Sequence, residues 1–248
     1  MEKTLTTLLL PETVRPGLDI ASSTAVVIDV LRATSVMTAA GASGVRRIHT
    51  CETIASAETL ASSLSERPLL CGERQCVPIE GFDLGNSPLS YTTECVRDRE
   101  MILTTTNGTK AIKLVQSARR ILVASLANLS TVVAQIASDD NVLLVCAGTH
   151  GEVSGEDVLL AGGIAEALGE HEAWSMDDAS SLARLHWQQA NDGAGVLAAL
   201  RDSRGGRNLI ALGYDADVEE CSRLNHVQGW VERDSEADRM TSFTFRMP

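Results

Sequence analysis

The first residues that could do chemistry follow the apolar run Ala25–Ile28, and they are Asp29, Arg32, Thr34 and Ser35. Four consecutive apolar residues rich in β-branches are typical of a strand buried on both faces, as in the centre of a parallel sheet. Open α/β sheets bind their ligands at the carboxyl ends of such strands, where Asp29 is expected. An acid that can hold a metal, beside a cation and hydroxyls that can hold an anion, indicates phosphate chemistry.

Two further groups of polar residues follow short apolar stretches. Glu73 and Arg74 come directly after a predicted strand, although an adjacent pair of this kind is more often an exposed salt bridge. In the loop 81–88, Asn86 and Ser87 could donate hydrogen bonds to an oxyanion, and a purely structural turn is the alternative. These residues are candidates for the same site.

A threonine-rich strand then runs into a turn and a helix. The candidates for binding substrate here are Thr106, Asn107, Gly108 and Thr109. Free backbone N–H groups at a helix start, with hydroxyls and a lysine, would form a phosphate cradle. The alternative is a tight Asn-Gly turn with a threonine N-cap. The segment is not a Walker A loop, because the glycine-to-lysine spacing of that motif is missing.

The fifth group lies between the predicted strand that ends at Cys146 and the next helix. Gly148, in a glycine turn, is a further candidate for binding substrate, and Glu156 and Asp157 occupy the first turn of the helix. Acids there stabilise a helix through its dipole, which is a sufficient structural reason for them. Two carboxylates at the same sheet edge as Asp29 could instead complete an oxygen-rich Mg²⁺ site.

The elements that must position these groups alternate along the chain. The predicted strands are Ala25–Val30, Val45–Thr50, Leu69–Cys71, Met101–Thr105, Arg120–Ser125 and Val142–Cys146; the predicted helices are Thr34–Ala42, Ile54–Ser65, Gly108–Ala118, Ser130–Ala137 and Val158–Leu168, with further helices in Ser175–Arg204. Strands that alternate with helices predict parallel strands with crossover helices, and one parallel sheet would gather all five groups at its carboxyl edge.

The sequence also makes predictions about the C-terminal segment and the number of domains. About the last 30 residues, with a dense mixture of acidic and basic side chains near Glu232–Arg239, indicate a solvated surface segment. No linker rich in Pro, Gly or Ser divides the chain, so residues 1–248 are predicted to form a single domain. Val26–Thr38 and Val142–Ala161 share a strand–turn–helix design, which leaves two intertwined α/β halves as the alternative. The fold class is therefore α/β.

Composition limits the function. The 248 residues are 44% hydrophobic and 3% aromatic, which favours a globular α/β core over an aromatic-rich sandwich. The net charge of −12 opposes binding to nucleic acid or to an anionic membrane. It also repels a phosphorylated substrate, so an anion site needs a divalent metal and a few arginines or lysines. Six scattered cysteines without a C-x-x-C pair, and no signal-peptide core, predict a cytoplasmic protein.

Taken together, five motifs resemble the 2-phosphosulfolactate phosphatase (ComB) family. They are IDVLRAT (28–34), GER (72–74), GFDLGNSP (81–88), TTTNGT (104–109) and CAG…SGEDVLLAG (146–162), and LGYDADVEEC (212–221) in the tail is similar too. The resemblance implies a three-layer α/β/α fold with a largely parallel central sheet. It also implies Mg²⁺-dependent hydrolysis of 2-phosphosulfolactate to 3-sulfolactate and phosphate, a step toward coenzyme M. The chain departs from the family pattern at 75–78, which is more polar in the family.

The resemblance carries roles onto residues of this chain. The matched positions are Asp29, Arg32, Glu73, Arg74, Asn86, Ser87, Asn107, Thr109, Glu156 and Asp157. In the expected mechanism, Asp29, Glu156 and Asp157 hold Mg²⁺, and the two arginines clamp the anionic substrate. Glu73 is a further catalytic candidate.

The nucleophile stays open between a metal-activated water, Asp29 and Cys146. The alternatives in function are a phosphatase or phosphotransferase that acts on another phosphorylated 2-hydroxy acid, and a non-catalytic sensor of such a metabolite. A homodimer is possible with each of these functions.

Overall fold

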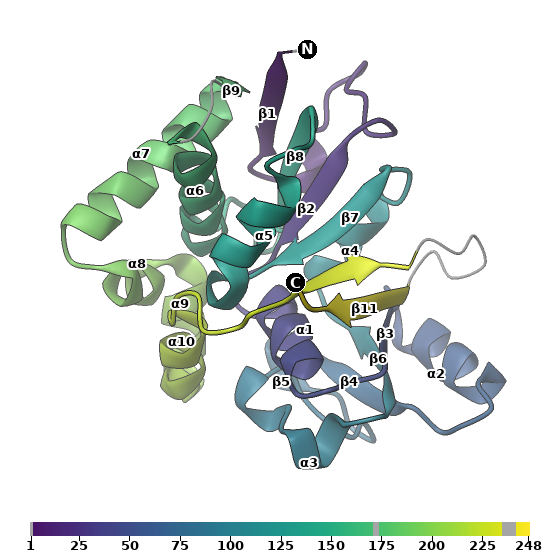
Figure 1. Ribbon diagram of the computed structural model, residues 1–248. Helices are drawn as coiled ribbons and strands as arrows, with labels where there is room; N and C mark the ends of the chain where they lie inside the picture. Colours follow the sequence, from purple (N-terminus) through teal and green to yellow (C-terminus); the bar gives the residue numbers. More distant parts are fainter. Residues whose placement is uncertain (1, 171–173, 235–241) are drawn as a thin grey trace.

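The computed structural model describes residues 2–170, 174–234 and 242–248, and within them the strands form one eleven-stranded sheet (Figure 1). The spatial order is β5 (Val77–Pro78), β4 (Leu69–Arg74), β6 (Glu100–Thr104), β3 (Arg47–Thr50), β11 (Ser242–Arg246), β10 (Trp230–Arg233), β7 (Arg120–Ala124), β2 (Thr24–Ile28), β8 (Asn141–Cys146), β1 (Lys3–Leu8) and β9 (Trp174–Met176). All six strands predicted from the sequence are present, with bounds shifted by a few residues.

Helices cover both faces of this sheet. They are α1 (Ala33–Ala42), α2 (Ile54–Ser63), α3 (Thr93–Val96), α4 (Gly108–Leu114), α5 (Leu129–Ile136), α6 (Gly155–Gly169), α7 (Asp178–Asp192), α8 (Val196–Asp202), α9 (Arg204–Ala211) and α10 (Asp215–Cys221). The strand β2 shows why there are two cores. Val26 and Ile28 belong to one buried cluster with α5 and α6, whereas Ala25 and Val27 belong to another with α1 and α4. Successive side chains of a strand point to opposite faces, so a fully apolar β2 needs helices on both sides. The α/β class is confirmed.

The sheet consists of two parallel groups of strands. The strands β4, β6 and β3 are parallel to one another, and so are β7, β2, β8, β1 and β9. Between the groups, the pairings β7–β10, β10–β11 and β11–β3 are all antiparallel. Three successive reversals make the two groups run in opposite directions along the ladder. The expectation of one parallel sheet with a single carboxyl edge is therefore wrong.

The twist of the sheet nevertheless brings the carboxyl ends of the two groups together. Adjacent strands rotate by about 20–25° relative to each other. Five pairings separate β2 from β6, so this rotation accumulates between them. Figure 1 shows the strands turning from upright at β1 to nearly horizontal at β10. As a result, residues after β2 and β6 contact each other, as the site below shows.

The predicted surface segment near the C-terminus is also wrong in the part that the structure describes. Trp230–Arg233 is the strand β10, Val231 and Phe243 are fully buried, and β10 and β11 lie in the middle of the sheet. The charges that suggested solvent are largely paired, since Glu232 accepts a hydrogen bond from Arg120 at 2.9 Å. Residues 235–239 of the predicted segment lie outside the described residues.

No helix within 2–170, 174–234 or 242–248 combines the length and the apolar character that crossing a bilayer requires.

The central position of β11 makes a prediction about stability. Phe243 is completely buried against the core that contains Val36 and Ile121, whereas Met247, four residues later, is 64% exposed. Phe243→Ala should lower the free energy of unfolding by about 3–5 kcal/mol, because it leaves a large cavity. Met247→Ala is the control and should change it by less than about 0.5 kcal/mol. Urea unfolding followed by circular dichroism measures both, and equal effects would contradict a core role for β11.

Candidate active site

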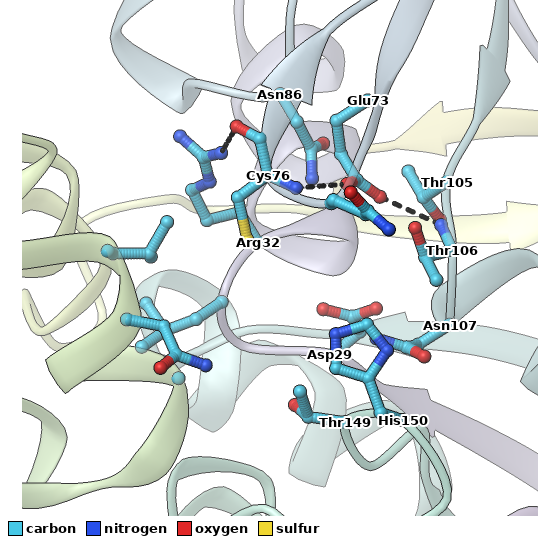
Figure 2. Close-up of a pocket in the computed structure, with 15 residues that line it drawn as sticks. Asp29, Arg32, Glu73, Cys76, Asn86, Thr105, Thr106, Asn107, Thr149 and His150 are labelled. Carbon is cyan, nitrogen blue, oxygen red and sulfur yellow. Dashed lines mark hydrogen bonds between the residues drawn. The ribbon is translucent and has the colours of Figure 1, made fainter. Parts of the chain in front are cut away.

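A small cavity lies where the carboxyl ends of β2, β4, β6 and β8 meet, with residues of α9 on a further side (Figure 2). Asp29 and Arg32 enter it after β2, Glu73 from the end of β4, and Thr106 after β6. Candidate residues of four of the five predicted groups line the cavity, although they come from both parallel groups of strands. The fifth group contributes Thr149 and His150 but none of its candidate residues.

Asp29 lies at the floor of this cavity and is only 7% exposed. Its carboxylate accepts a hydrogen bond from the Ala33 backbone N–H at 3.1 Å, at the start of α1, and another from the backbone of Gly108. Burial raises the pKa of Asp29 to about 7, and the neighbouring carboxylates of Glu73 and Glu156 add to this rise. The ionised form of Asp29 is therefore unfavourable unless a cation lies beside it, and without a cation the carboxyl group tends to keep its proton.

Gly108 is required for the close approach of α4 to Asp29. A Cβ atom at this position would lie 2.7 Å from Ala33 Cβ and 2.8 Å from Asp29 Oδ2. The preceding residue, Asn107, occupies the N-cap of α4 but makes no side-chain capping hydrogen bond, and it lines the cavity. Asn107 is therefore available to a ligand, and the alternative of a threonine N-cap at this turn does not hold.

Glu73 joins the ends of two strands beside Asp29. Its Oε2 accepts a hydrogen bond from the backbone N–H of Cys76 at 2.7 Å, and its Oε1 accepts one from that of Thr106 at 2.8 Å, as Figure 2 shows. Gly72, at φ +139°, precedes it, and a Cβ there would lie 1.9 Å from the carbonyl oxygen of Thr104. This glycine lets β4 and β6 approach closely enough for Glu73 to reach both loops.

Unpaired oxygen atoms face the cavity. Among the described residues, four buried side-chain oxygens have no hydrogen-bond partner, namely Asn86 Oδ1, Thr105 Oγ1, Thr106 Oγ1 and Glu156 Oε2. The first three belong to residues that line the cavity. Buried polar atoms without partners are rare and cost free energy, so their gathering at one place indicates a ligand that pairs with them.

Arg32 is the arginine that lines the cavity, and its charge is already matched. Its guanidinium forms an ion pair with Asp217 of α10, stacks 4.5 Å from the Tyr214 ring, and donates a hydrogen bond to the Cys76 carbonyl at 3.3 Å (Figure 2). With Asp29 and Glu73 present as well, the lining has no excess of positive charge. An anionic substrate would need a further cation there.

Other predicted residues are not brought into the cavity. Arg74 donates to the carbonyls of Glu73 and Glu52 and to the Thr104 hydroxyl. The hydroxyl of Thr109 donates to the Thr105 carbonyl at 2.9 Å, and that of Ser87 to Asp217 at 2.7 Å. These three side chains stabilise the loops around the cavity.

Cys146 does not suit the role of nucleophile. It is completely buried in the core at the end of β8. Burial raises the pKa of its thiol well above the ordinary value, and the negative charges of Asp157 and Glu156 act in the same direction. A thiolate is therefore disfavoured at this position.

The three predicted metal ligands are not assembled as a set. Asp157 accepts hydrogen bonds from the backbone N–H groups of Val30 at 2.9 Å and Gly148 at 3.0 Å, so it ties the ends of β2 and β8. Burial raises the pKa of both Glu156 and Asp157. Glu156 turns toward Ser203 and the backbone of Gly205 in α9. Within the described ranges, no group of three or more His, Cys, Asp or Glu side chains is placed to hold a metal ion.

The cavity itself still has oxygen donors that suit Mg²⁺. Asp29 supplies a carboxylate, and Asn86 and Thr105 supply buried neutral oxygens without partners. Mg²⁺ keeps several waters and is commonly bound through one or two carboxylates together with substrate phosphate oxygens. The donor set therefore fits Mg²⁺ held by Asp29 and a bound phosphate, without the predicted trio.

Several lining residues were not predicted. They are Leu31, Gln75, Cys76, Thr105, Thr149, His150, Gly205, Asn208 and Leu209. Thr105 and Gln75 are next to predicted residues, so proximity in the sequence was a usable signal for them. Asn208 lies in α9, well over forty residues after the last of the five motifs, and none of these motifs indicates it.

The buried state of Asp29 makes a prediction about pH. Its pKa is about 7 in the folded protein and 3.8 in an unfolded chain. The unfolded state therefore loses this proton first as the pH rises, and the wild type loses stability between about pH 4 and pH 7. The Asp29→Asn variant does not lose stability in this way. The free energy of unfolding of the variant minus that of the wild type should therefore be larger at pH 8 than at pH 4, by a few kcal/mol.

Denaturant titrations at the two pH values, with a chelator present, measure this difference. Asp140→Asn is the control, because Asp140 is exposed just before β8. A relative stability of Asp29→Asn that does not change with pH would contradict the raised pKa.

Comparison with known proteins identifies the family of this chain. The model of a family described as 2-phosphosulpholactate phosphatase matches residues 8–231. A protein of Thermotoga petrophila named "Probable 2-phosphosulfolactate phosphatase" is 42% identical, over 80% of this chain and 84% of its own length. Proteins with the same name from Thermotoga maritima and Pseudothermotoga lettingae are 41% and 38% identical, over 80% and 81% of this chain and 84% of their own lengths. The chain therefore belongs to the 2-phosphosulfolactate phosphatase family, as its five motifs predict.

Proposed function

We propose that this protein is a Mg²⁺-dependent phosphatase that converts 2-phosphosulfolactate and water to 3-sulfolactate and phosphate, a reaction of the coenzyme M biosynthesis type. The observation that carries the proposal is one cavity lined by buried Asp29 and by Asn86, Thr105 and Thr106, whose side-chain oxygens have no hydrogen-bond partner. The substrate is inferred from the names of the relatives, since phosphate chemistry alone does not select it.

In this proposal Asp29 holds the metal ion together with the Asn86 side-chain oxygen. When bound, Mg²⁺ would supply positive charge to the phosphate and lower the pKa of a coordinated water. The raised pKa of Asp29 supports this role, because burial and the nearby Glu73 and Glu156 carboxylates make a cation favourable beside it.

The neutral donors and Arg32 would bind the phosphate. The hydroxyls of Thr105 and Thr106 are buried without partners and can each donate to a phosphate oxygen. The guanidinium of Arg32 has five N–H donors and spends only some of them on Asp217 and Cys76, so it can also bind an oxyanion. Phosphoryl transfer depends mainly on such positioning and charge stabilisation.

A water molecule is the proposed nucleophile. Cys146 is buried away from the cavity with a raised thiol pKa, which disfavours its thiolate. Direct attack by Asp29 would place the same carboxylate in two roles, as metal ligand and as nucleophile. Attack by water leaves Asp29 free to hold the cation throughout.

The first test is phosphate release from racemic 2-phosphosulfolactate by the purified protein, with Mg²⁺ or with excess chelator. We expect release with Mg²⁺ and its loss with chelator, because the cavity lining has no surplus cation to offset the substrate. A heat-treated sample controls for chemical hydrolysis. Release that chelator leaves intact would contradict the metal, and no release with Mg²⁺ would direct the search to other phosphorylated 2-hydroxy acids.

Two substitutions test the assignment of the nucleophile. Asp29→Asn should lower kcat by at least about 100-fold, since it removes the charged metal ligand. Cys146→Ala should keep kcat within about threefold of the wild type, because a buried thiol outside the cavity takes no part. Steady-state phosphate release measures both. If Cys146→Ala folds but has lost its activity, Cys146 becomes a candidate nucleophile again. Full activity of Asp29→Asn would exclude every mechanism in which Asp29 is a metal ligand or a nucleophile.

A further inference from the structure

One guanidinium at the cavity is held by contacts from two separate segments of the chain. Arg32 forms an ion pair with Asp217 of α10, stacks on Tyr214 just before α10, and donates to the Cys76 carbonyl in the turn between β4 and β5. Figure 2 shows the Arg32 side chain and the Cys76 carbonyl joined across the upper part of the site. The arginine thus has a defined position before any ligand arrives.

Asp217 is itself oriented by a second partner. Its Oδ2 faces Arg32, and its Oδ1 accepts a hydrogen bond from the Ser87 hydroxyl at 2.7 Å. The residue before Ser87 is Asn86, which lines the cavity and whose side-chain oxygen has no hydrogen-bond partner. Both oxygens of Asp217 are therefore engaged, and they connect α10 to two walls of the site.

The burial of this pair argues against a role in stability alone. The side chains of Arg32 and Asp217 are 2% and 4% exposed. Removing both charges from water costs about as much as their attraction returns, so apolar side chains would stabilise the same place as well. An ion pair of this kind at the wall of a cavity instead fixes a charged group in a place where a ligand can use it.

We propose that Asp217 is a positioning residue for the oxyanion site, and that it acts through Arg32. By holding the guanidinium in one orientation, Asp217 directs the remaining N–H donors of Arg32 toward an oxyanion of the substrate. The inference rests on the oxyanion-binding part of the proposed function. The helix α10 (Asp215–Cys221) lies far along the chain from the strand ends that carry the predicted catalytic residues. Through Asp217, this helix contributes to the site.

A double-mutant cycle tests this inference. The proteins are the wild type, Asp217→Asn, Arg32→Met and the double variant. Asp217→Asn should reduce kcat/KM and the affinity for inorganic phosphate by about tenfold, and it should also lower the melting temperature, because the buried guanidinium loses its charged partner. In the Arg32→Met background the same substitution should have little further effect on phosphate affinity, because Met has no N–H donors and the route from Asp217 to the ligand is then lost.

Asp215→Asn is the matched control on the same helix. Asp215 lies in the first turn of α10 and pairs with the partly exposed Arg201 at 3.1 Å, away from the cavity lining. Its substitution should leave kcat/KM and phosphate affinity unchanged. If Asp217→Asn fails to fold, Asp217→Glu keeps the charge and moves it by one methylene, and it should fold with weakened phosphate binding.

Calorimetric titration with inorganic phosphate in the presence of Mg²⁺ separates this inference from the proposed reaction. Coupled effects on phosphate affinity, without turnover of 2-phosphosulfolactate, would overturn the proposed substrate and support the role of Asp217. Additive effects of the two substitutions, an unchanged phosphate affinity in folded Asp217→Asn or Asp217→Glu, or no phosphate binding by the wild type would each overturn it.

Discussion

The burial of acidic side chains at the ends of neighbouring strands is the constraint on which the rest of this structure depends. Asp157 and Glu73 are each held by two backbone N–H groups, and through these bonds they join the end of β2 to that of β8 and the end of β4 to that of β6. Glu156 is held by Ser203 and α9. The carboxylates that make the site negative are thus the ones that assemble its loops.

Asp29 lines the cavity, as Glu73 does, whereas Asp157 and Glu156 do not. Burial, together with the charges of Glu73 and Glu156, raises the pKa of Asp29 to about 7. A fold that concentrates carboxylates in this way cannot also bind a phosphorylated anion unless positive charge enters the cavity. The proposed use of Mg²⁺ follows from this electrostatic requirement, and Arg32 alone does not meet it because Asp217 already neutralises its charge.

The sheet topology explains how residues so far apart in sequence reach one cavity. The antiparallel pair β10–β11 joins two parallel groups that run in opposite directions along the ladder. Gly41 of α1 allows this pair to pack closely, since a Cβ there would lie 2.4 Å from the Phe245 ring. The twist that accumulates across the hairpin then turns the carboxyl ends of both groups toward each other. The C-terminal strands therefore set the angle between the two halves of the site.

The amino-acid sequence by itself determined the six apolar strands, most of the helices between them, the α/β class and the family. Local signals suffice for these, because a buried β-branched run or an Asn-Gly turn is defined by a few adjacent residues. The strands β1, β5, β9, β10 and β11 escaped prediction. β5 and β9 have only two and three residues, and the mixture of Thr and Leu in Lys3–Leu8 and the mixed charges near Glu232 are ordinary on a surface too. Which polar residues face the cavity was settled by the tertiary structure. It turned Arg74, Ser87 and Thr109 toward loops and engaged Glu156 and Asp157 in hydrogen bonds outside the cavity lining. It also brought Asn208 to the cavity and Asp217 to Arg32. Such outcomes depend on strand direction and on helices that pack from distant parts of the chain, and short-range patterns hold no information about either.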